Sequence, residues 1–159
     1  MTIIKTVSIL LSVPLLAWAA GLAWLSFTSV PPEVRLVDGH LRACPETPNC
    51  VSSESAAPAA HIEPLRFKGA PQAAWSGLRS SIRALGGTIV EEQEGVLWAT
   101  FTSRIFRFVD DMECRMVVEE GVIHLRSASR AGWSDMGVNR ERVERLRRLF
   151  DQRQGGVKR

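Results

Sequence analysis

Three arginines and three serines are grouped between residues 126 and 140, in the stretch RSASRAGWSDMGVNR. Guanidinium groups bind carboxylate and phosphate groups through paired N–H donors, and serine hydroxyl groups add further donors. A helix is predicted to begin near Asn139, and its first backbone N–H groups would add partial positive charge. The segment therefore predicts a site for an acidic group, carried by a small ligand, a partner's side chain or a lipid headgroup. The candidate binding residues are Arg126, Ser127, Ser129, Arg130, Asn139 and Arg140.

A second interpretation of the same segment comes from the acidic residues that surround it. In the predicted hairpin of residues 111–130, Asp111 lies opposite Arg130, and Glu113 lies diagonal to both Arg126 and Arg130. Carboxylates of the chain itself would then bind the arginines, in a network of ion pairs that orders the loop. Both interpretations remain open at this point. The supporting polar residues are Arg104, Asp110, Asp111, Glu113 and Asp135.

A small hydrolase-like enzyme that uses the polar face of the 111–130 hairpin is the alternative to a binding module. The chain has no phosphate-binding glycine loop, no G-x-S-x-G and no H-E-x-x-H motif. Ser127 and Ser129 alternate to the strand face opposite His124, which argues against a serine–histidine pair. Asp110 and Asp111 point to opposite faces for the same reason. We therefore assign no catalytic residue and favour a binding module over an enzyme.

Cys44 and Cys50 bracket the short segment CPETPNC. Five intervening residues can close a small disulfide loop, and an exported domain favours oxidation. Free thiols and half of a metal site are the alternatives. The three histidines, at positions 40, 61 and 124, have no metal-ligand spacing, so we expect no metal and no cofactor. Cys114 fits a small hydrophobic residue in the interior.

The elements that position these residues are predicted from residue 61 onward. Residues 61–67 form a short candidate strand, and Pro71 opens an amphipathic helix that Gly86-Gly87 ends. Two hairpins follow, at 88–103 and 111–130, and a last amphipathic helix begins near Asn139. This order predicts an α+β fold, in which a mostly antiparallel sheet of about five strands carries two helices on one face.

The second hairpin also predicts which side chains are buried. A two-residue turn at Glu120-Gly121 pairs Glu119 with Val122. Because side chains alternate along a strand, one face then carries apolar residues and the other polar ones. The apolar set is Met112, Cys114, Met116, Val118, Ile123 and Leu125, and the polar set is Asp111, Glu113, Arg115, His124, Arg126 and Arg130.

The amino-terminal part of the chain contains an uncharged run of 25 residues, from Thr6 to Val30. Such a helix is long enough to cross the hydrocarbon core of a bilayer. A cleaved signal peptide is the rival interpretation, because Ala17-Trp18-Ala19 resembles a cleavage site. We favour an uncleaved anchor at residues 1–30 in the cell (inner) membrane, with the C-terminal domain extracytoplasmic. Residues 31–60 are then an irregular tether with a cysteine loop, and residues 61–154 form the α+β domain.

The net charge of +3 is unevenly distributed. Residues 140–159 contain eight basic and three acidic side chains, so the rest of the chain is slightly acidic. Residues 155–159 are a basic tail. Basic residues are not interleaved with exposed aromatic ones, which argues against a nucleic-acid partner. The expected partners are the membrane, through residues 6–30, and a protein or an acidic small molecule.

Three segments together resemble a known family: CPETPNCVSS at 44–53, RIFRFVDDME at 104–113 and RSASRAGWSDMGVNRERVE at 126–144. The residues of these segments and their order along the chain are similar to those of the DUF1499 family. This is a group of small bacterial and plastid-type proteins without an established activity. The resemblance covers residues 41–150, which is nearly all of the region that follows the apolar run. It implies a class of protein, and it supplies no catalytic residues for this chain.

Overall fold

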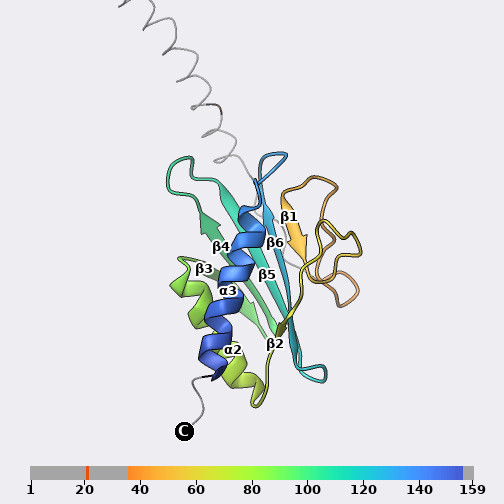
Figure 1. Cartoon of the computed structure of the whole chain (residues 1–159), viewed down its shortest axis with the longest axis vertical. Coiled ribbons are helices and arrows are strands. Elements are labelled where there is room, and N and C mark those ends of the chain that lie inside the picture. The colour runs from red at the N-terminus through yellow and green to blue at the C-terminus, as the bar shows by residue number, and fades with distance from the viewer. Residues whose placement is uncertain (1–20, 22–35, 156–159) are drawn as a thin grey trace, which may run out of the picture.

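The structure is a computed structural model that describes Gly21 and residues 36–155. In these residues the strands are β1 (Cys50–Ser52), β2 (Leu65–Arg66), β3 (Thr88–Gln93), β4 (Val96–Thr102), β5 (Val109–Val117) and β6 (Val122–Ser129). The helices of residues 36–155 are α2 (Pro71–Ala84) and α3 (Val138–Gly155). The strands form one antiparallel sheet in the order β1-β6-β5-β4-β3, and β2 also pairs with β6. Figure 1 shows the two helices side by side across one face of this sheet.

The hydrophobic core lies between the helices and the sheet. Pro71 occupies the start of α2, where its missing N–H costs no hydrogen bond, and Gly86 follows the end of the helix with a φ of 83°. Leu78 and Ile82 of α2 are fully buried, as is Phe150 of α3. They pack in one cluster with apolar residues of β4, β5 and β6. The predicted α+β class, with an antiparallel sheet and two helices, is thereby confirmed.

The sheet has six strands rather than about five, because the segment expected to be an irregular tether contains β1. Cys50 pairs with Ala128 of β6, and Ser52 pairs with Arg126. All three residues of β1 are buried. A strand of three residues is too short to show a hydrophobic period, and the prolines around it suggested a loop. The strand expected at residues 61–67 is confined to Leu65–Arg66.

The β5–β6 hairpin has the predicted faces but a different register. Val117 pairs with Val122, so the turn contains four residues, 118–121, instead of two. The register differs from the expected one by two residues. Because side chains alternate with a period of two, an even shift leaves the strand residues on their predicted faces. Val118, expected on the buried face, lies in the turn and is exposed.

No helix among residues 36–155 is long and apolar enough to cross a membrane. The predicted anchor at residues 1–30 lies outside the described residues, apart from Gly21. The predicted basic tail also lies outside them beyond Gly155.

Candidate functional site

The face of the sheet opposite the helices carries buried ion pairs, and we call it the polar face. Arg130 donates from Nε and Nη2 to the two carboxylate oxygens of Asp111, at 2.9 and 2.8 Å. Trp98 donates its indole N–H to Asp111 Oδ1 at 2.8 Å. Asp111 and Trp98 are both buried. The expected contact between Asp111 and Arg130 is therefore present, as a diagonal contact rather than between directly paired residues.

Glu113 is the second buried carboxylate of the polar face and is bound by two arginines. Arg126 pairs directly with it in the ladder and donates from Nη1 at 3.1 Å, while Arg42 donates to the same oxygen. The Nε atoms of Arg42 and Arg126 are buried, and neither has a hydrogen-bond partner among the described residues. Burial lowers the pKa of Arg126, the Glu113 carboxylate opposes this effect, and the Arg42 guanidinium adds to it.

Asn139 holds the start of α3 against the helix-covered face of the sheet. Its Oδ1 accepts hydrogen bonds from Ser127 Oγ and Arg142 Nη1, each at 2.6 Å. Its Nδ2 donates to Ser129 Oγ at 3.1 Å. Arg142 in turn donates to Asp110 Oδ2 at 2.5 Å. Asn139 and Ser127 are fully buried, so these predicted binding residues connect helix and sheet.

The N-terminus of α3 is capped by a carboxylate of the chain itself. Asp135 accepts hydrogen bonds from the backbone N–H of Gly137 at 2.9 Å and of Asn139 at 2.8 Å. Arg140 donates to the backbone carbonyls of His61 and Ala59, at 3.0 and 2.7 Å. The positive end of the helix and this guanidinium thus already have acceptors.

The anion site at residues 126–140 stays a prediction, and the structure shows what an anion would compete with. Arg126 and Arg130 are bound to buried carboxylates, and Arg140 is bound to carbonyl groups. Arg104, the remaining member of the expected network, is exposed in the loop between β4 and β5. These contacts are those of an ion-pair network that orders the loop, which was the second interpretation of the sequence.

A serine–histidine contact exists that the sequence did not suggest. Ser53 Oγ and His124 Nδ1 share a hydrogen bond at 3.1 Å. The Ser53 hydroxyl also accepts from the N–H of Leu125 at 2.9 Å, and Glu54 lies 3.8 Å from the same histidine nitrogen. A catalytic serine and its orienting acid bind opposite nitrogens of the imidazole ring. Here both approach Nδ1, so the arrangement differs from that of a catalytic triad.

The predicted disulfide loop is confirmed. Cys44 and Cys50 are bonded to each other, with their Cα atoms 5.6 Å apart. Cys114 is a free, fully buried thiol whose pKa is raised by burial, so it is inert. Among the described residues, no group of histidine, cysteine and acidic side chains could hold a metal ion.

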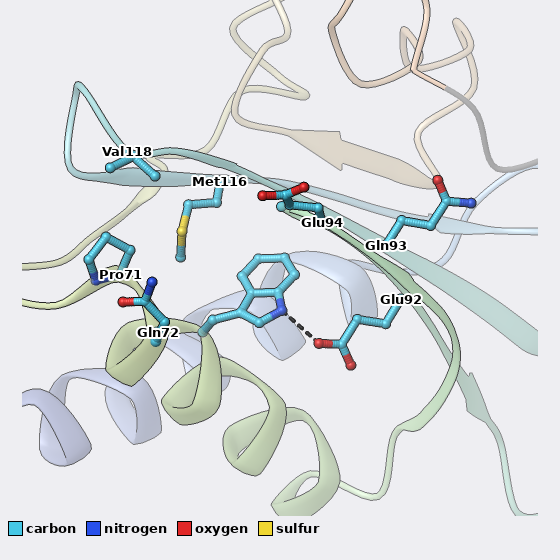
Figure 2. Close-up of a pocket in the computed structure, with 9 residues that line it drawn as sticks. Pro71, Gln72, Glu92, Gln93, Glu94, Met116 and Val118 are labelled. Carbon is cyan, nitrogen blue, oxygen red and sulfur yellow. Dashed lines mark hydrogen bonds between the residues drawn. The ribbon is translucent and has the colours of Figure 1, made fainter.

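An open groove lies where α2 begins, and we call it the Trp75 groove. It encloses about 620 Å³, a volume within the usual range for ligand sites. Figure 2 shows Pro71 and Gln72 of α2 on one side of the groove, Met116 and Val118 above them, and Glu92 on the other side. Glu94 lies beside Met116. The lining residues are Pro71, Gln72, Trp75, Glu92, Gln93, Glu94, Gly95, Met116 and Val118.

The Trp75 groove places an aromatic ring beside carboxylate groups. Trp75 donates its indole N–H to Glu92 Oε1 at 2.7 Å, and Arg79 donates to the same oxygen at 3.2 Å. Glu94 makes no hydrogen bond or ion pair with another residue of the described part of the chain. An exposed carboxylate next to an indole ring suits a cation, because the ring face is also electron-rich.

Comparison with known proteins agrees with the resemblance seen in the sequence. The family described as a protein of unknown function, DUF1499, matches residues 40–150. The chain belongs to the DUF1499 family. Neither the comparison with curated proteins nor that with solved structures gave a match. The matched region contains every strand and helix described above except the last few residues of α3.

The Trp75 groove of this DUF1499 domain was not predicted. The sequence pattern predicts Met116 only as a buried residue of the 111–130 hairpin. One signal was available, since residues 91–94, at the end of β3 and in its turn, and residues 119–120, in the β5–β6 turn, contain five glutamates and no basic residue. Both turns lie at the same end of an antiparallel sheet, which concentrates negative charge there.

Proposed function

We propose that this DUF1499 protein is a membrane-anchored, extracytoplasmic binding module. Its ligand is a segment of a partner protein that places one basic side chain in the Trp75 groove. The observation that carries the proposal is the position of the unpaired Glu94 carboxylate on the rim of a groove that Trp75 lines.

Two features of the chain support the location. The uncharged run from Thr6 to Val30 has the length and polarity of a membrane anchor. The disulfide between Cys44 and Cys50 is typical of proteins that fold in an oxidising compartment. Together they favour a domain exported across the membrane that remains attached to it.

The groove supports the choice of ligand through shape and charge. The indole N–H of Trp75 is fixed by Glu92, so the ring is held in place before a ligand arrives. A lysine or arginine stem can pack on Met116 and Val118, and its charged end can reach the Glu94 carboxylate. Because the groove is open to solvent between a helix and two turns, it can admit a chain segment.

The binding experiment uses the purified full chain in detergent micelles with its disulfide intact. Fluorescein-labelled peptides carry a single lysine flanked by leucines, and matched peptides carry glutamine or glutamate at the same position. We expect the lysine peptide to bind and the glutamate peptide not to bind. Equal binding of the three peptides would show that the groove does not select a cation.

The location is tested separately by alkaline extraction of membranes that contain the full chain. We expect the protein to stay in the membrane fraction. Release of a product that begins near Ala20 would show a cleaved signal peptide and overturn the anchor.

A further inference from the structure

The end of the sheet opposite the Trp75 groove consists of two loops. Residues 103–108 connect β4 to β5, and residues 130–137 connect β6 to α3. The backbone N–H of Arg130 donates to the carbonyl of Val109 at 3.1 Å, which places the loops beside each other. Figure 1 shows them together at the upper end of the molecule. We call this surface the loop end.

Large hydrophobic side chains are exposed at the loop end. Ile105 is 82% exposed, Trp133 is 73% exposed and Met136 is 96% exposed. Val138, at the start of α3 and two residues after Met136, is also exposed. Four of the seven exposed large hydrophobic residues of the described chain are thus at this end. Scattered exposed hydrophobic residues are ordinary, but several of them in two adjacent loops are typical of a surface that contacts another phase or molecule.

Hydrogen bonds hold both loops in shape, so the exposed residues are displayed on an ordered support. The backbone N–H of Ser103 donates to the carbonyl of Phe108 at 2.8 Å, and Phe108 N–H donates to Ser103 Oγ at 2.9 Å. Asn49 donates from Nδ2 to the carbonyl of Gly132 at 2.7 Å. Asp135 closes the second loop onto α3.

The two loops themselves contain more basic than acidic residues, while the exposed Glu46 of the cysteine loop lies near Met136. Arg104 and Arg107 flank Ile105 and are exposed. The two loops contain one acidic residue, Asp135, whose carboxylate caps α3. Tryptophan, aliphatic side chains and arginine are the residues that proteins place at the interface of a bilayer with anionic headgroups.

We propose that the loop end rests on the surface of the membrane that anchors the chain, with Ile105, Trp133 and Met136 among the lipid headgroups. This inference rests on the anchor of the proposed function. Five residues, 31–35, separate the uncharged run from the described domain, and an extended chain of that length spans about 17 Å. The domain is therefore kept within reach of the bilayer surface. The Trp75 groove, at the opposite end of the sheet, then faces away from the membrane and toward a partner.

The test places an environment-sensitive NBD fluorophore on the full chain in vesicles. The substitution Met136→Cys introduces the labelling site, because Cys114 is buried and the other two cysteines are bonded. Glu119→Cys, in the β5–β6 turn, is the matched control. The vesicles are phosphatidylcholine with or without phosphatidylglycerol, and nitroxide lipids serve as quenchers.

We expect the label at position 136 to shift to shorter wavelength and to be quenched by nitroxide lipids, more strongly with phosphatidylglycerol. The label at position 119 should keep the emission wavelength of a fluorophore in water and should not be quenched. Trp133→Asp should abolish the shift at 136 while the unfolding midpoint is kept, because Trp133 is exposed.

Three results would overturn the inference, and they differ in what else they affect. If both labels report water while the chain floats with the vesicles, the loop end does not contact lipid and the anchor stands. If the label at 136 shifts without nitroxide quenching, the surface contacts protein instead. If the chain does not float with the vesicles, the anchor of the proposed function fails as well.

Discussion

Arg130 binds Asp111 through two parallel hydrogen bonds, and its guanidinium carbon lies 5.8 Å from the centre of the Trp98 ring. Trp98 donates to the same carboxylate. The three side chains form one unit on the polar face, in which a buried carboxylate faces a guanidinium charge and accepts three hydrogen bonds. This arrangement favours the structural view of Arg130, which predicts loss of stability when the arginine is removed.

The substitution Arg130→Ala should destabilise the protein by about 2–4 kcal/mol, because it leaves the Asp111 charge buried without its partner. Urea unfolding followed by circular dichroism measures this. Arg104→Ala is the matched control, and its effect should stay within about 0.5 kcal/mol, as for an exposed residue. If Arg130→Ala keeps the stability of the wild type and loses a bound anion instead, the arginine is a binding residue.

The pH dependence of stability should follow His124 and Glu54. Burial lowers the pKa of His124 below 6.5, and Glu54 opposes this effect. The unfolded chain therefore binds a proton at a pH where the folded chain does not, so stability falls as the pH drops below about 6.5. Burial acts to raise the pKa of Glu54, but hydrogen bonds from Arg115 and from the Leu41 N–H outweigh it and lower the pKa below 4.5. Its contribution is also lost on acidification, through this lowered pKa.

Unfolding midpoints measured between neutral and mildly acidic pH test this account. His124→Gln removes one of the two titrating groups and should flatten the decline just below pH 6.5. A variant that loses stability on acidification as steeply as the wild type would contradict the assignment to His124.

The cap of α3 provides a third prediction. Asp135→Ala removes the acceptor of two backbone N–H groups and should cost about 1 kcal/mol, whereas Asp135→Asn should retain most of the stability. Because the alanine variant leaves the helix N-terminus without its carboxylate, sulfate should stabilise it more than it stabilises the wild type. An equal response of both proteins to sulfate would show that the helix end is closed to anions.

The disulfide should stabilise the edge of the sheet that β1 forms. The bond between Cys44 and Cys50 closes a short loop, for which the chain-entropy argument gives about 2 kcal/mol. The double variant Cys44→Ser with Cys50→Ser should therefore unfold earlier, and amide hydrogens of β1 should exchange faster than they do in the wild type. Unchanged exchange at β1 would mean that pairing with β6 alone holds the strand.

The elements with a clear hydrophobic period were predictable from the sequence. The helix that begins at Pro71 and the two faces of the β5–β6 hairpin depend on local patterns, and the structure contains both. The length of the hairpin turn was wrong, because Glu120-Gly121 fits a two-residue turn as well as a four-residue one. The error did not move side chains between faces, since the shift was even.

Contacts between distant parts of the chain could not be predicted in the same way. Ser53 and His124 are 71 residues apart and meet only because β1 pairs with β6. Arg42 reaches Glu113 from a segment that looked like a tether. The Trp75 groove combines a helix, a turn and a strand, and none of these carries a local motif for binding.

The most direct test of the proposed function is a titration of the lysine peptide against the wild type and two charge-matched variants. Glu94→Gln removes the carboxylate on the rim of the groove, and Glu119→Gln removes the same charge from a turn at the same end of the sheet. We expect Glu94→Gln to weaken binding about fivefold, which corresponds to ~1 kcal/mol for a surface ion pair, and Glu119→Gln to have a much smaller effect. Equal affinity of all three proteins for the peptide would contradict the assignment of the Trp75 groove as the ligand site.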